Sequence, residues 1–102
     1  MTWAANGRTA SNSNDRGSAE TRRRRKQWLL DEFGDGVQAQ CGFDGCETMV
    51  TFETMQVDRF PIAGIDGGTY RRGNIRPACG PCNFADGLEI AARRREELKA
   101  AA

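Results

Sequence analysis

Apolar residues are sparse along the chain and fall into a few short groups. In the first group, Trp28, Leu29 and Phe33 recur at helical spacing, which predicts a helix from about Ser18 to Phe33. Ser18 is suited to cap this helix, and Gly34 is suited to end it. Because the apolar face occupies only the second half of the helix, we expect the first half to project into solvent.

Two segments rich in β-branched and aromatic residues come next, and they predict strands over Thr48–Phe52 and Thr54–Phe60. Residues 61–73 contain four glycines and one proline, a composition typical of a loop. A short extended piece follows over residues 74–76, and Pro77 is expected to end it because proline donates nothing to a strand ladder.

A second helix is expected at the C-terminal end of the chain. It should begin after Cys82 and run to about Leu98. Its apolar stripe is predicted to consist of Leu88, Ala91, Ala92 and Leu98. Two helices that enclose short strands indicate a small α+β fold.

The composition limits the size of this fold. In 102 residues, 38% hydrophobic and 28% charged residues predict one thin domain with a small core. The chain has no apolar run long enough to cross a bilayer, and its Asn/Ser-rich start lacks the apolar stretch of a signal peptide. We therefore expect a cytoplasmic protein with a disordered leader over residues 1–18 and a domain over residues 19–102.

The net charge of +1 conceals segregated charges. Residues 22–26 are five consecutive cations, residues 27–58 carry seven acids and no base, and residues 59–82 carry four arginines against one aspartate. Adjacent cations repel one another and a phosphate backbone would relieve the repulsion, which favours DNA contact over a merely solvated helix face. The predicted DNA-binding residues are Arg22, Arg23, Arg24, Arg25, Lys26, Arg71, Arg72 and Arg76.

Four cysteines form two short-spaced pairs, Cys41 with Cys46 and Cys79 with Cys82, and each pair lies in a glycine-containing turn. Two such turns can direct four thiolates at one ion, so the pattern predicts a tetrahedral structural zinc site. The alternatives are a redox Cys-x-x-Cys motif and two disulfides, which a cytosolic location and the lack of a thioredoxin-like pattern disfavour. Histidine is absent, which excludes imidazole as ligand or base.

The stretch between the cysteine pairs resembles the HNH endonuclease family, in particular its small phage-type members with a four-cysteine zinc site. The resemblance covers about Trp28 to Asp86 and depends on the order and spacing of three segments. They are Val57-Asp58-Arg59-Phe60-Pro61, Gly67-Gly68-Thr69-Tyr70 and Asn74-Ile75-Arg76-Pro77-Ala78-Cys79-Gly80-Pro81-Cys82-Asn83.

The resemblance implies a ββα-metal unit, in which two short strands joined by a loop precede a helix. It assigns Asp58 and Asn83 as ligands of a catalytic divalent ion, and their oxygen donors suit Mg²⁺ or Mn²⁺. It assigns to Asn74 the role of pinning the loop through bonds to backbone. On the residues alone, Asp58 could instead pair with a nearby arginine, and Asn74 could be a turn residue.

Arg59 stands where the family usually has a histidine that activates water. An arginine accepts no proton at neutral pH, so we expect Arg59 to hold the scissile phosphate while the ion activates the water. Tyr70 is a conceivable helper, although packing under the loop is favoured for it.

These observations together predict a metal-dependent DNA endonuclease. The resemblance further implies a phage origin, a role in genome packaging or DNA processing, and phage packaging proteins as partners. The alternative is a non-catalytic zinc-stabilised module that binds DNA or protein through a decayed HNH site.

Overall fold

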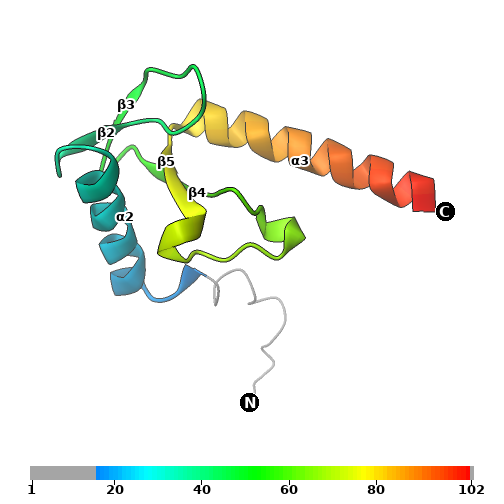
Figure 1. Cartoon of the computed structure of the whole chain (residues 1–102), viewed down its shortest axis with the longest axis horizontal. Helices are drawn as coiled ribbons and strands as arrows, with labels where there is room; N and C mark the ends of the chain where they lie inside the picture. Colours follow the sequence, from blue (N-terminus) through cyan, green and yellow to red (C-terminus); the bar gives the residue numbers. More distant parts are fainter. Residues whose placement is uncertain (1–15, 102) are drawn as a thin grey trace, which may run out of the picture.

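The computed structural model describes residues 16–101 (Figure 1). Most of the predicted leader, residues 1–15, and the last residue lie outside the described part. Within it the chain forms a small α+β structure with two α-helices and two small antiparallel sheets, as the sequence indicated.

Helix α2 spans Ala19–Phe33 and begins where the sequence predicted. The Thr21 backbone N–H donates to the Ser18 side chain at 3.1 Å, and the helix ends at Gly34, whose N–H donates to the Leu30 carbonyl. Leu29 and Leu30 are the buried residues of the helix, whereas Phe33 is 47% exposed. The prediction that Phe33 belongs to the packed face is therefore wrong: Phe33 instead lies edge-on to Trp28.

Each sheet is a pair of short strands. The first sheet pairs β2 (Gln38–Gln40) with β3 (Met49–Thr51), with Ala39 opposite Val50. The second pairs β4 (Gln56–Arg59) with β5 (Ile75–Ala78). Strands β3 and β4 lie inside the two predicted segments, while β2 was not expected, because its sequence Gln-Ala-Gln has no β-branched or aromatic residue.

Pro77 lies inside β5 and does not end it. Its carbonyl accepts from the Gly42 N–H at 2.8 Å, on the side of the strand away from β4. The nitrogen and carbonyl of one residue point to the same side of a strand, so the missing N–H removes nothing from the ladder with β4. The strand therefore continues to Ala78, and Cys79 follows directly after it.

Helix α3 spans Gly80–Ala101 and extends away from the rest of the protein (Figure 1). It has no buried residue, and Leu88 and Leu98 are 57% and 56% exposed. The predicted stripe of Leu88, Ala91, Ala92 and Leu98 thus does not pack within residues 16–101. In that part of the chain, neither helix has the length and apolarity needed to cross a membrane.

The core joins α2 to both sheets and includes two of the cysteines. Its buried side chains are Leu29, Leu30, Ala39, Cys41, Val50, Met55, Ile75, Ala78 and Cys79. Within residues 16–101, Cys41 and Cys79 are two of only nine buried side chains in this core, and Cys46 and Cys82 pack against it. The cysteine cluster is therefore a large part of the core.

The loop between β4 and β5 contains two short 3₁₀ turns, η1 (Gly64–Asp66) and η2 (Arg72–Asn74). Its closest approach is at Gly68, where a Cβ would overlap the Ile62 backbone. A residue without a side chain is needed there because the backbone, unlike a flexible side chain, cannot move aside.

Candidate functional site

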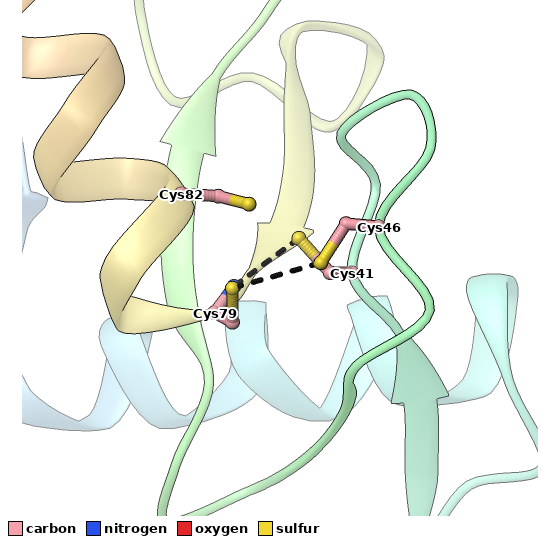
Figure 2. Close-up of side chains that lie close together, drawn as sticks. All are labelled: Cys41, Cys46, Cys79 and Cys82. Atoms are coloured by element: carbon pink, nitrogen blue, oxygen red, sulfur yellow. Dashed lines mark hydrogen bonds between the residues drawn. The ribbon is translucent and has the colours of Figure 1, made fainter.

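The side chains of Cys41, Cys46, Cys79 and Cys82 converge on one point (Figure 2). All four are free thiols, and their sulfur atoms lie within 4.8 Å of one another. This separation suits a tetrahedral ion with bonds of about 2.3 Å to each sulfur, whose sulfur atoms are about 3.8 Å apart. The cluster therefore provides a four-thiolate site for a metal ion such as zinc.

Each cysteine pair is positioned by a different part of the fold. Cys41 follows β2, and its N–H donates to the Thr48 carbonyl, while the Cys46 N–H closes a turn onto the Phe43 carbonyl. Cys79 follows β5, and Cys82 lies in the first turn of α3. The Cys79 N–H donates to the Cys41 sulfur at 3.4 Å, a bond that links the two turns directly.

The pKa values of three of these thiols are shifted, and the directions differ. Hydrogen bonds from Thr48 lower the pKa of Cys46 to about 6, whereas bonds with Cys79 and Cys46 raise the pKa of Cys82 to about 12. Burial raises the pKa of Cys41. Four neighbouring thiolates would repel one another strongly, and a divalent cation removes that penalty.

A cleft of about 400 Å³ runs along β4, with walls formed by α2, the β4–β5 loop and α3. It brings together seven residues that the sequence analysis singled out: Arg22, Arg25, Lys26, Asp58, Arg59, Tyr70 and Asn83. Arg16, Gln56 and Gly64 also line it. Residues from four separate segments of the chain thus share one concave surface.

Asp58 is buried on β4 and pairs with Arg76 on β5. The carboxylate Oδ2 accepts from Arg76 Nε at 2.9 Å, and the two residues are also opposite one another in the strand register. Burial raises the pKa of Asp58 above its ordinary value, Arg76 opposes the rise, and nearby Asp86 adds to it. The pairing of Asp58 with a nearby arginine, which the sequence left open as an alternative, is therefore present. Metal binding by Asp58 stays a prediction.

Arg76 connects this carboxylate to the first cysteine turn. Its guanidinium carbon lies 3.7 Å from the Phe43 ring centroid and 3.8 Å from that of Phe60, and Nη1 is 3.4 Å from the Gly42 carbonyl oxygen. With only 13% of its side chain exposed, Arg76 is engaged inside the protein. Its predicted DNA contact would require these interactions to be given up.

Asn83 is held by a residue that the sequence analysis missed. Its Nδ2 donates to Gln56 Oε1 at 2.8 Å. Gln56 lies two residues before Asp58, so the period-2 alternation of a strand puts both on one face of β4. That alternation was a signal from which Gln56 could have been found.

The side chain of Asn74 pins the β4–β5 loop. Its Oδ1 accepts from the Ile62 N–H at 2.8 Å, and its Nδ2 donates to the Ile62 and Thr69 carbonyls, both at 2.9 Å. These are the backbone bonds that the resemblance led us to expect. Since Asn74 is 8% exposed, its side chain supports the loop from inside the protein.

Tyr70 lies between two arginines in the cleft. The guanidinium carbons of Arg25 and Arg59 are each 4.6 Å from its ring centroid. Arg59 occupies space left by Gly64, where a Cβ would overlap the guanidinium. The expected packing role of Tyr70 thus takes the form of cation–π contacts, which the sequence alone did not indicate.

Within residues 16–101, the other predicted DNA-binding residues, Arg23, Arg24, Arg71, Arg72 and Arg76, do not line this cleft. Arg24 pairs with Glu20, and Arg72 lies over the Trp28 ring with 5.3 Å between guanidinium carbon and centroid. Arg23 and Arg71 are exposed. Lys26 lines the cleft, but its amine donates to the Phe52 carbonyl at 3.0 Å.

Comparisons with protein-family models, with curated proteins and with solved structures gave no match.

Proposed function

We propose that this protein is a metal-dependent DNA endonuclease of the HNH type. The observation that carries the proposal is the cleft shared by Asp58 of β4 and Asn83 of α3. These are the residues that the resemblance assigns to the catalytic ion. The order β4–β5–α3 also agrees with the strand–strand–helix order that the resemblance implies.

The donor atoms of these two residues fit a hard cation. Oδ2 of Asp58 accepts from Arg76, and Nδ2 of Asn83 donates to Gln56. Within residues 16–101, Oδ1 of Asp58 and Oδ1 of Asn83 have no hydrogen-bond partner, which leaves these two oxygens available in the cleft. Mg²⁺ prefers oxygen donors and is commonly held by one or two protein ligands plus water. When bound, such an ion supplies Lewis acidity and activates water for attack on phosphorus.

The remaining residues of the cleft would bind and orient the substrate. Arg59 carries a planar cation suited to bidentate contact with a phosphate, and it is positioned by Tyr70 and the space at Gly64. Asn74 holds the loop that forms one wall. The cysteine cluster fixes the start of α3, and Asn83 directly follows Cys82. Phosphodiester cleavage depends mainly on such positioning.

A non-catalytic DNA- or protein-binding module is the second candidate. The Asp58–Arg76 ion pair favours it, because a carboxylate that already has a cationic partner binds a metal ion less readily. The absence of histidine removes the family's usual base and favours the same alternative.

Incubation of the full chain with supercoiled plasmid distinguishes the two candidates. We expect nicking with Mn²⁺ and none when Mn²⁺ is omitted; omission is preferable to a chelator, which would also compete for zinc. Asp58→Asn should lose the activity, whereas Asp44→Ala, which removes an exposed carboxylate in the first cysteine turn, should keep it. Plasmid binding without any Mn²⁺-dependent nicking would support the module instead.

Gly64 offers a separate test of the position of Arg59. An alanine at this position should displace the flexible guanidinium, at a cost in folding free energy below about 1 kcal/mol. Because small displacements of a substrate-positioning group are costly, we expect nicking to slow roughly 10- to 100-fold.

Gly73→Ala is the matched control for Gly64→Ala. A Cβ at Gly73 meets nothing within 4 Å, so this variant should cut at the parent rate. Rates are compared by plasmid nicking and stability by thermal unfolding. Equal rates for both alanine variants would contradict a role for the position of Arg59.

A further inference from the structure

Positive charge is concentrated in the cleft to a degree that the whole chain does not suggest. The charged residues that line it are five cations, Arg16, Arg22, Arg25, Lys26 and Arg59, and one anion, Asp58. The net charge of the chain is only +1. Since Asp58 is already paired with Arg76, the cleft has an excess of positive charge that favours an anionic ligand.

Helical geometry divides the basic run of α2 into two sets. Arg22, Arg25 and Lys26 are three and four residues apart, share one face of the helix and line the cleft. Arg23 and Arg24 do not line it. The run is therefore not one uniform basic patch: part of it belongs to the same concave surface as Asp58 and Asn83.

Arg25 is the most constrained member of this set. Its Nη1 donates to the Arg16 carbonyl at 2.9 Å, and its guanidinium lies over the Tyr70 ring. Burial lowers its pKa, Tyr70 opposes this shift, and repulsion from Arg22 adds to it. A cation held in place, partly desolvated and beside a like charge is stabilised by an anion that binds between them.

The cleft arginines also have guanidinium N–H donors that no ion pair uses. Within residues 16–101, Arg22, Arg25 and Arg59 form no ion pair, whereas Arg24, Arg76, Arg93 and Arg94 do. Each guanidinium carries five N–H donors, and stacking on an aromatic face leaves those donors free at the edge. Tyr70 therefore orients Arg25 and Arg59 without consuming their hydrogen-bonding capacity.

We infer that Arg22 and Arg25 of α2 form, together with Arg59, a phosphate-binding wall of the cleft that holds the backbone of duplex DNA next to Asp58 and Asn83, with Tyr70 as the positioning residue. The choice of DNA as ligand rests on the proposed function. The wall itself rests on the charges, stacking and spacing described above.

The test compares three single-charge deletions in α2. A fluorescent duplex of about 20 base pairs is titrated with the full chain, without Mg²⁺ or Mn²⁺, at several salt concentrations. Arg25→Ala and Arg22→Ala should each weaken binding about tenfold and reduce the slope of log K against log salt by about 0.9. Arg23→Ala removes the same charge from the same helix, but from outside the cleft, and should change affinity less than about twofold.

Tyr70 is tested by two substitutions. Tyr70→Phe keeps the ring that the guanidinium groups stack on and should bind like the parent. Tyr70→Leu removes the ring without removing any cation, and it should weaken binding roughly threefold to tenfold with little change in the salt slope. Rescue by phenylalanine separates ring stacking from any role of the hydroxyl.

The outcomes separate this inference from the proposed function. If Arg25→Ala and Arg22→Ala bind no worse than Arg23→Ala while the parent still nicks plasmid, the wall is wrong and the endonuclease stands. If both variants lose affinity but the parent never nicks, the wall stands and the endonuclease is wrong. Circular dichroism checks folding; because Arg22 is exposed, Arg22→Ala remains a valid test if Arg25→Ala proves unstable.

Discussion

Replacement of Cys79 by serine is expected to leave the chain largely unfolded at neutral pH. Cys79 is 5% exposed, belongs to the core and follows the strand that carries Arg76. A structural zinc site contributes on the order of 10 kcal/mol to folding, which is comparable with the entire stability of a small domain. The small core of residues 16–101 offers little to replace that contribution.

Cys41→Ser, Cys46→Ser and Cys82→Ser should behave in the same way, because three thiolates hold the ion far less tightly than four. Far-UV circular dichroism and metal content are the measurements, with one zinc per chain expected for the parent. Asp44→Ala, in the same turn as Cys41 and Cys46 but exposed, is the control that should stay folded. A parent that is folded with well under one zinc per chain would contradict this account.

Local signals in the sequence predicted the parts of the fold that depend on neighbouring residues. The Ser18 cap, the Gly34 end of α2 and the loop between β4 and β5 all follow from short-range chemistry. The two cysteine turns followed from their spacing. Features that depend on tertiary contacts were missed: β2 forms because β3 pairs with it, and Pro77 is tolerated because its nitrogen faces away from β4.

The same division holds for the candidate site. The backbone bonds of Asn74 were expected from the motif, and the grouping of Asp58 with Asn83 in one cleft agrees with it. The stacking of Arg25 and Arg59 on Tyr70 could not be predicted, since it joins α2, β4 and the loop, and Arg25 and Tyr70 are 45 positions apart in the sequence. Nor did the sequence indicate that Arg22, Arg25 and Lys26 are the members of the basic run that line the cleft.

The substitution of Arg59 by alanine is expected to slow cleavage by about 100-fold, equivalent to roughly 3 kcal/mol of lost transition-state stabilisation. The affinity for Mn²⁺ should not change, because Arg59 is not among the proposed ligands. Asp58→Asn should abolish cleavage by weakening the ion site, while its amide oxygen can still accept from Arg76 and preserve the fold. Plasmid nicking and Mn²⁺ titration measure these effects separately.

Arg59→His tests the mechanism most sharply, because it restores the residue that the resembled family usually has at this position. With arginine present, the mechanism has no side chain with a pKa near 6.5 as its base, and the water activated by the ion must lose its proton instead. That loss becomes easier as the pH rises, so the rate at saturating Mn²⁺ should climb through the neutral range. With histidine present, the neutral imidazole can accept a proton and the protonated form cannot. The variant should therefore keep activity and gain a new inflection between about pH 6 and 7, below which the rate falls. If Arg59→Ala cuts as fast as the parent, or if Arg59→His shows no such inflection, Arg59 does not occupy the catalytic position assigned to it.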